Sequence, residues 1–134
     1  MNGNYFVDTN VLIYCYTVTE LDKQLKARQI VAPSGRVIST QVLQEIANTL
    51  RRKFKKEWLE VIATLNEVSS QFTIHQNSAD TINKAISIAD RYGYSFYDSL
   101  IIAAALETNC SVLYSEDMQD GQIIAGVLTI RSPF

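Results

Sequence analysis

Four acidic residues lie near expected junctions between strands and helices: Asp8, Glu45, Asp98 and Asp117. Asp8 comes directly after the apolar residues 5–7, and Asp117 lies in the polar loop after the apolar residues 112–114. The carboxyl ends of parallel strands meet at one edge of a sheet, so we expect these acids to converge there. Neighbouring carboxylates repel one another unless some take up protons or a cation lies between them.

The expected cation is Mg²⁺ or Mn²⁺, because the ligands would be oxygens without His or Cys companions. His75 is the only histidine, and Cys15 and Cys110 both lie in apolar stretches. Such an ion binds phosphate oxygens and activates water, so the chemistry that fits is phosphodiester hydrolysis. The chain has no glycine-rich phosphate loop, which argues against an enzyme with a nucleotide cofactor.

Each acid also has a purely structural interpretation. Asp8 can cap the helix that follows it. Asp98 forms a Ser-x-x-Asp capping box with Ser95, and an acid there also suits the helix dipole. Glu45 projects onto the face opposite the apolar stripe of its helix, a face expected to be solvated. Asp117 is typical of a turn residue.

The positive charges are unevenly distributed. Five of the twelve lysines and arginines fall within residues 51–56. Cations at a helix end suit its dipole, and such a run is usually solvated. Arg52 shares the polar face of Glu45, which makes it a candidate contact for a phosphate held at the acids.

The elements that position these residues alternate between strand and helix. Apolar runs predict strands at residues 5–7, 37–38, 72–74, 112–114 and 127–130. Helical spacing predicts helices at residues 11–16, 21–30, 41–54, 58–65, 79–92 and 97–108. Ser39 or Thr40 is the expected N-cap of the third helix, and Gly93 ends the fifth. Short strands alternating with helices predict an α/β domain whose parallel sheet is covered on both faces.

Composition supports one globular domain over residues 1–134. The chain is 47% hydrophobic and has a net charge of −2, which excludes intrinsic disorder. The longest apolar run, residues 100–106, is far shorter than the roughly 20 residues of a membrane helix. The N-terminus lacks the basic segment of a secretory signal, and the sparse cysteines fit a reducing compartment. We therefore expect a cytoplasmic protein that does not enter a membrane.

Five segments together resemble PIN-domain proteins, in particular the VapC-like toxins of toxin–antitoxin pairs. They begin with Asp-Thr-Asn-Val-Leu-Ile-Tyr at residues 8–14 and Ser-Thr-Gln-Val-Leu-Gln-Glu at residues 39–45. The most specific are Tyr-Asp-Ser-Leu-Ile-Ile-Ala-Ala-Ala at 97–105 and Leu-Tyr-Ser-Glu-Asp-Met-Gln-Asp-Gly at 113–121. The ending Arg-Ser-Pro-Phe at 131–134 also matches. The resemblance spans the chain and keeps the order of the acids, although residues 17–35 are short for the long early helices of many relatives.

The resemblance implies a three-layer α/β/α fold with a short, mostly parallel sheet and a metal-dependent endoribonuclease activity. It implies that the catalytic acids are Asp8, Glu45, Asp98 and Asp117. Of these, Asp8, Asp98 and Asp117 would hold Mg²⁺ or Mn²⁺, and Glu45 would bind the ion directly or through water. In this interpretation a water activated by the ion hydrolyses RNA.

Further residues enter through the same resemblance. Thr9, Asn10 and Ser115 match polar positions that orient the acids. Glu116 and Asp120 flank Asp117, so either is an alternative for the fourth acid. The expected partners are an RNA substrate, a cognate antitoxin and a second copy of the chain. The helices at 21–30 and 58–65 are candidate docking surfaces for the antitoxin, although core packing explains their apolar residues equally well.

Two other functions compete with the nuclease. A PIN-like module that binds RNA or protein without cleaving anything is the main alternative, and four mutually repelling acids argue against it. A phosphatase of the haloacid-dehalogenase type also begins with Asp after a strand. It needs a second Asp two residues later, where this chain has Asn10.

Overall fold

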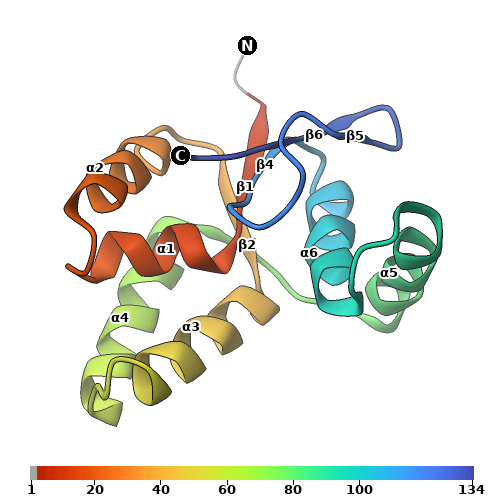
Figure 1. The fold of residues 1–134 in the computed structure, drawn as a ribbon. Coiled ribbons are helices and arrows are strands. Elements are labelled where there is room, and N and C mark those ends of the chain that lie inside the picture. The colour runs from red at the N-terminus through yellow and green to blue at the C-terminus, as the bar shows by residue number, and fades with distance from the viewer. Residues whose placement is uncertain (1–2) are drawn as a thin grey trace.

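A six-stranded sheet forms the centre of the computed structural model, which describes residues 3–134 (Figure 1). Its strands lie in the order β3–β2–β1–β4–β6–β5. In chain order they are β1 (Asn4–Val7), β2 (Arg36–Ser39), β3 (Thr73–His75), β4 (Cys110–Tyr114), β5 (Ile123–Ile124) and β6 (Leu128–Arg131). All neighbours are parallel except β5 and β6, which are antiparallel. The prediction of a mostly parallel sheet is therefore confirmed.

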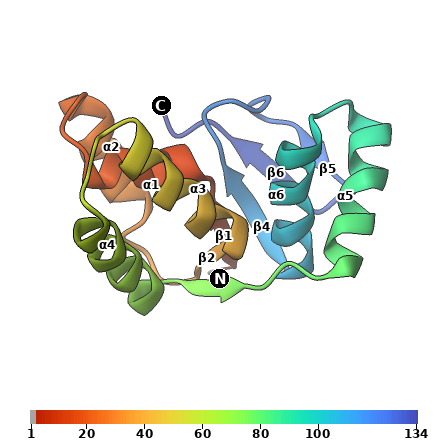
Figure 2. The same ribbon diagram turned by 90° about the horizontal axis from the view of Figure 1, so that it is seen from below.

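Within residues 3–134, six helices cover the sheet. They are α1 (Thr9–Tyr16), α2 (Leu21–Ile30), α3 (Thr40–Arg52), α4 (Trp58–Gln71), α5 (Ala79–Tyr92) and α6 (Phe96–Glu107). Helices α1 to α4 lie on one side of the sheet, and α5 and α6 lie on the other (Figures 1 and 2). This placement follows from right-handed crossovers, because the chain moves from β1 towards β3 and then returns to β4. The predicted three-layer α/β/α fold is confirmed.

Strand β1 is where the direction of the crossovers reverses. The strands after it are added first on its β2 side and later on its β4 side. Tyr5 accordingly pairs with Arg36 of β2 on one side and Val112 of β4 on the other. In parallel α/β sheets the crevice at such a reversal, outside the carboxyl ends of the strands, is the usual ligand site. Asp8 is the residue that follows β1 at this point.

The core explains why the short strands are apolar throughout. Phe6, Val7, Ile38 and Leu113 are completely or almost completely buried, since helices cover both faces of the central strands. Helix α6 is buried nearly all round, as its continuous apolar sequence predicts. A rigid, packed sheet of this kind holds the residues at its strand ends in fixed positions.

The structure differs from the sequence-based prediction in several places. Helix α4 runs to Gln71, six residues beyond the predicted range 58–65. Strand β5 is only two residues long and lies within the segment predicted as a polar loop. Neither Ser39 nor Thr40 caps α3 with its side chain: the buried Ser39 hydroxyl has no partner in the described part of the chain, and the Thr40 hydroxyl accepts from the Asn77 N–H. Helix α3 also ends at Arg52 rather than at Phe54. Gly93 ends α5 as predicted, with a φ of 79° that suits glycine.

Candidate active site

The four acids predicted from the sequence line one pocket of about 360 Å³. They come from four separate parts of the chain: the end of β1, the middle of α3, the first turn of α6 and the loop after β4. The complete lining is Asp8, Thr9, Asn10, Glu45, Asn48, Thr49, Asp98 and Asp117. The structure therefore brings these acids together at the carboxyl edge of the sheet.

Asp8 is the most constrained of the four acids. Its backbone N–H donates to the Tyr114 carbonyl at 3.0 Å, which extends the β1–β4 pairing into the pocket. Its Oδ1 accepts from the Thr9 N–H at 2.7 Å, and its Oδ2 accepts from the Ser115 hydroxyl at 2.9 Å. Asp8 is thus both the N-cap of α1 and a pocket residue. The capping and functional interpretations describe the same side chain.

The environment of Asp8 opposes its ionisation. Burial raises its pKa to about 6, even though the hydrogen bonds from Thr9 and Ser115 favour the carboxylate. The negative charges of Glu45 and Asp98 raise the pKa further. Acids that perturb one another in a cleft are a physical mark of a functional site.

Glu45 does not lie on a solvated face, so that expectation is wrong. Its Oε1 accepts from the Thr9 hydroxyl at 2.6 Å, and its Oε2 accepts from the Gln41 amide at 3.3 Å. The same Gln41 amide nitrogen donates to the Tyr97 carbonyl of α6 at 3.1 Å. The polar face of α3 therefore meets α1 and α6 at Gln41 and Glu45, whereas Asn48 and Arg52 further along the same face are exposed.

Asp98 and Asp117 complete the acid pocket. The Asp98 N–H donates to the Ser95 hydroxyl at 3.2 Å, which is one half of the predicted capping box. Burial raises the pKa of Asp98, and the charges of Asp117 and Glu45 raise it further. Asp117 accepts from the Asn10 amide at 2.9 Å and is more exposed than the others. Thr9, Asn10 and Ser115 thus each donate to a pocket acid.

The two acids beside Asp117 face elsewhere. Glu116 accepts from Lys23 at 2.6 Å and from the Tyr14 hydroxyl at 3.0 Å. Asp120 accepts from the Ser132 N–H at 2.8 Å. Neither residue lines the acid pocket, so the structure favours Asp117 over both alternatives.

Two other sequence candidates also lie outside the acid pocket. Arg52 lines a neighbouring hollow with Arg51, Lys55 and Glu57. His75 contacts Glu107, with its Nε2 3.0 Å from Oε1. A triad or metal site based on this histidine therefore finds no support among the contacts of His75.

Asn48 and Thr49 line the acid pocket and Gln41 donates to Glu45, and none of the three was predicted from the sequence. Asn48 and Thr49 lie three and four residues after Glu45, which places them on the same face of α3. Helical spacing could have identified both residues once Glu45 was assigned to a pocket. Gln41 lies four residues before Glu45 and supports it from within α3.

The pocket suits a hard divalent cation in the chemistry of its donors. All four acids offer oxygen ligands. Burial raises the pKa of Asp8 and of Asp98, and the charges of neighbouring acids raise both further, so a counter-charge would be favourable here. Within residues 3–134, no three His, Cys, Asp or Glu side chains are grouped closely enough to hold an ion together. The carboxylate oxygens are therefore the type of ligand that such an ion prefers, but they do not form a preformed coordination shell.

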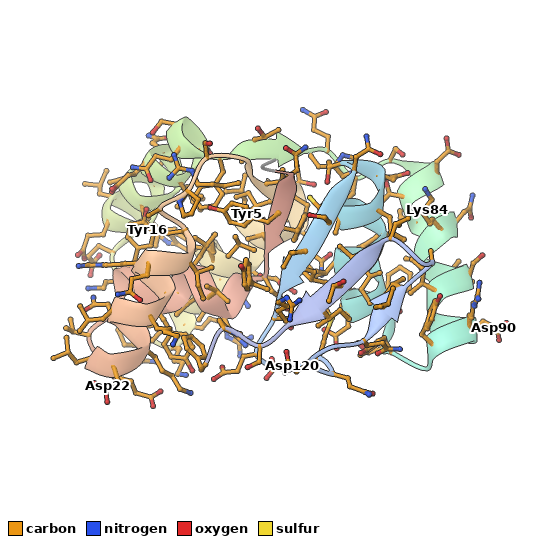
Figure 3. The ribbon with its side chains drawn as sticks, turned by 90° about the horizontal axis from the view of Figure 1, so that it is seen from above. Tyr5, Tyr16, Asp22, Lys84, Asp90 and Asp120 are labelled. Atoms are coloured by element: carbon orange, nitrogen blue, oxygen red, sulfur yellow. The ribbon has the colours of Figure 1, made fainter. Side chains whose placement is uncertain are left out.

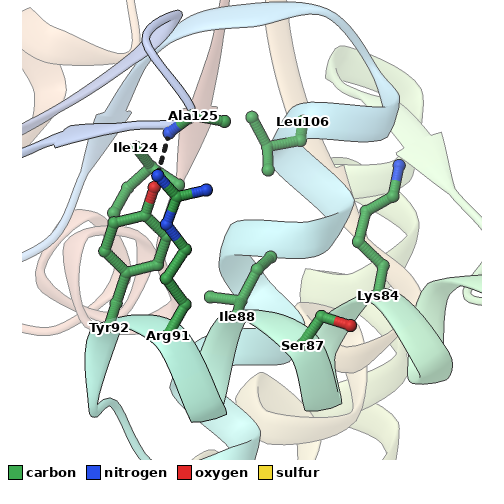
Figure 4. A pocket seen from close by; sticks show the side chains of 8 residues that line it. All are labelled: Lys84, Ser87, Ile88, Arg91, Tyr92, Leu106, Ile124 and Ala125. Atoms are coloured by element: carbon green, nitrogen blue, oxygen red, sulfur yellow. Dashed lines mark hydrogen bonds between the residues drawn. The ribbon is translucent and has the colours of Figure 1, made fainter.

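A second hollow, of about 380 Å³, lies between α5, α6 and the β5–β6 hairpin (Figure 4). Ile88, Leu106 and Ile124 form its apolar surface, and Lys84 and Arg91 lie at its rim. No carboxylate lines it, so it offers nothing comparable to the acid pocket for a cation.

Comparison with solved structures shows the same fold elsewhere. A toxin–antitoxin complex from Klebsiella pneumoniae is 22% identical with a TM-score of 0.72, covering 98% of each chain. VapC20 from Mycobacterium tuberculosis, described as a sarcin–ricin loop cleaving toxin, is 21% identical with a TM-score of 0.69, covering 82% of this chain and 87% of that one. DNA-bound VapBC from Salmonella typhimurium is 17% identical with a TM-score of 0.72, covering 99% of this chain and 100% of that one.

Sequence comparison gives the family. A search of curated proteins finds no match. The family model described as "PIN domain" matches residues 5–119, a stretch that includes all four pocket acids. The chain therefore belongs to the PIN-domain family.

Proposed function

We propose that this protein is an endoribonuclease that hydrolyses RNA phosphodiester bonds at the acid pocket, with Mg²⁺ or Mn²⁺ as its cofactor. The observation that carries the proposal is the meeting of Asp8, Glu45, Asp98 and Asp117 in one pocket from four parts of the chain. A bound divalent ion would neutralise charge on the phosphate and lower the pKa of a water molecule. Membership of the PIN-domain family supports the same activity.

In this proposal the residues of the chain have separate tasks. Asp8, Asp98 and Asp117 hold the ion. Thr9, Asn10 and Ser115 are positioning residues, because each directs a hydrogen bond to one acid. Glu45 binds the ion directly or through water. Its Oε2 has only the longer bond from Gln41, which leaves that oxygen placed to accept a proton from water.

The decisive experiment is a cleavage assay on total cellular RNA with Mg²⁺, Mn²⁺ or EDTA. Wild type is compared with Asp98→Asn, which removes one carboxylate charge at constant size. Asp90→Asn is the matched control, since Asp90 points outwards from α5 (Figure 3). We expect discrete fragments with metal from wild type and Asp90→Asn, and none from Asp98→Asn. Equal cleavage by wild type and Asp98→Asn would refute the mechanism.

We further propose that the enzyme is the toxin of a toxin–antitoxin pair, a homodimer that acts in the cytoplasm and is neutralised by an antitoxin. The names of the similar solved structures support a toxin–antitoxin role. Leu21 and Leu25 on α2, and Leu59 and Ile62 on α4, are largely exposed apolar side chains suited to a protein partner. Within residues 3–134 no helix is both long and apolar enough to span a membrane.

The non-catalytic binding module remains the alternative function. It predicts that folded, partner-free protein binds RNA or Mn²⁺ but leaves every RNA intact in the assay above. Growth arrest on expression of wild type but not of Asp98→Asn would instead support the toxin. Light scattering of the purified chain tests the proposed homodimer separately.

A further inference from the structure

The end of α3 and the start of α4 concentrate positive charge beside the only tryptophan of the chain, Trp58. Residues 51–56 carry five of the twelve lysines and arginines and no acid. The remaining seven cations are shared by a chain with fourteen acids. A basic segment on an otherwise acidic protein marks a place where a polyanion can bind.

Trp58 is in contact with a cation and is still largely exposed. The Arg51 guanidinium lies over the indole ring, 5.0 Å from its centroid. Arg51 is fixed in turn by a 3.1 Å hydrogen bond from its Nη1 to the Lys56 carbonyl. Even so, 60% of Trp58 is exposed. The arrangement leaves aromatic surface in water that packing in the monomer does not use.

Two cations that share a hollow with Arg51 are not fixed in the same way. Arg52 and Lys55 are exposed, and with Arg51 and Glu57 they line a hollow of about 460 Å³. Both can contact phosphate groups without giving up a buried interaction. Glu57 lies on the same rim, so it limits how far an anion can enter on that side.

This basic hollow continues the acid pocket along one face of α3. Glu45 and Thr49 line the acid pocket, and Arg52 follows Glu45 by seven residues, which is two helical turns. Seven residues advance about 10 Å along a helix. A stacked strand advances about 3.4 Å per nucleotide, so roughly three nucleotides connect the two sites.

We propose that this region is a binding site for single-stranded RNA, in which Trp58 stacks on an unpaired base while Arg52 and Lys55 contact backbone phosphates. The inference rests on the proposed function, because it names the conformation of RNA that the acid pocket receives. Proteins hold single strands by combining exposed aromatic rings with cations that follow the backbone. A base inside a duplex is stacked on both faces by its neighbouring base pairs, so the ring can stack only on a base that is unpaired and unstacked.

Because Trp58 is the only tryptophan, its fluorescence reports directly on the proposed contact. The experiment uses the full chain with Asp98→Asn, in EDTA, titrated with a fluorescein-labelled 12-nucleotide RNA or with its duplex. Tryptophan emission reports stacking and fluorescein anisotropy reports binding. The titration is repeated with Arg52→Ala, Lys55→Ala, Trp58→Phe and Trp58→Ala. Lys26→Ala, which removes an exposed cation from α2, is the charge control.

We expect the single strand to quench Trp58 and the duplex to leave its emission nearly unchanged. Trp58→Ala should weaken binding about tenfold, and Trp58→Phe less, because a smaller ring still stacks. Arg52→Ala and Lys55→Ala should each lower the slope of log affinity against log salt by about 0.7. Lys26→Ala should match its parent. Circular dichroism checks that the variants keep their helices.

Several results would overturn the inference. One is RNA binding without a change in Trp58 emission, and another is unchanged RNA affinity in Trp58→Ala and Arg52→Ala. A third is a loss of antitoxin binding alone in these variants, which would make the region a protein interface. If the wild-type protein cleaves RNA but Trp58 is not quenched, the stacking site is refuted and the proposed nuclease activity stands. If Trp58 is quenched but no RNA is cleaved, the nuclease activity is refuted and the binding site stands.

Discussion

Thr9 joins two of the pocket acids: its hydroxyl donates to Glu45 Oε1 at 2.6 Å, and its backbone N–H donates to Asp8 Oδ1 at 2.7 Å. Asp8 follows β1 and Glu45 lies in α3, so the contact couples two parts of the fold through one residue. Thr9 is buried, so its hydroxyl is held in place for this contact. The relative position of Asp8 and Glu45 therefore depends on Thr9, which is not itself one of the four acids.

The first prediction concerns this hydroxyl. Thr9→Val keeps the shape and the backbone bond to Asp8 but removes the donor to Glu45. We expect RNA cleavage to fall about 10- to 100-fold, the usual effect of removing a hydrogen bond that orients a metal-site residue. Thr9→Ser, which retains the hydroxyl, should keep most of the activity. Equal losses in both variants would mean that packing, rather than the hydrogen bond, is what matters.

The second prediction separates the acids of the loop after β4. Asp117→Asn should abolish cleavage, because Asp117 lines the acid pocket. Glu116→Gln should retain it, because Glu116 faces Lys23 and Tyr14 instead. The substitution should instead lower stability slightly, because it weakens the contact with Lys23, and urea unfolding measures this change. Full activity of Asp117→Asn together with an inactive Glu116→Gln would reverse the assignment.

The third prediction is that stability without divalent ions falls as the pH rises from about 4 to about 6. The pKa of Asp8 is raised from 3.8 to about 6, so the folded protein binds more protons than the unfolded chain in this range. The resulting loss is fully present above the folded pKa and amounts to about 3 kcal/mol. The raised pKa of Asp98 acts in the same direction.

Urea unfolding in EDTA across this pH range measures the effect. Asp8→Asn should flatten the profile and should be more stable than wild type at pH 7. The Ser115 hydroxyl can rotate to accept from the new amide, so the substitution need not leave an unpaired group. A wild-type profile that rises towards pH 7 with the same slope as Asp8→Asn would contradict the prediction.

Much of the fold follows from the sequence because local and tertiary preferences agree. The apolar run before Asp8 is a central strand covered on both faces, and its uninterrupted apolar residues predict this burial. Strand β5 could not be predicted in the same way. Ile123 and Ile124 pair with Leu128 and Thr129 of β6, and two residues carry no period of their own.

The acid pocket was harder to predict in its details than in its location. The positions of Asp8 and Asp117 were predicted correctly because each follows an expected strand. For Glu45, the helical projection predicted a solvent-exposed face. That projection shows which residues share a face, not what the face meets, and α3 meets Thr9 across 36 positions of sequence. Likewise, the sequence does not show which of two adjacent acids in a loop faces the pocket. Here Glu116 is turned away by a hydrogen bond from Lys23, which lies 93 positions away in the sequence.

The last prediction joins the charge repulsion to the cofactor. A cation among the acids would favour their charged forms and so offset the burial and charge repulsion that raise the pKa values of Asp8 and Asp98. Mg²⁺ or Mn²⁺ should therefore stabilise the folded protein. At a hundred times its Kd the ion adds about 2.7 kcal/mol, which corresponds to about 10 °C in Tm for a domain of this size. Thermal unfolding with and without Mn²⁺ should show this shift at pH 7 and a smaller one at pH 5, where Asp8 is protonated in most molecules. Asp8→Asn and Asp117→Asn should lose most of the shift, while Asp90→Asn should retain it. Equal stabilisation of all three variants by Mn²⁺ would place the ion outside the acid pocket.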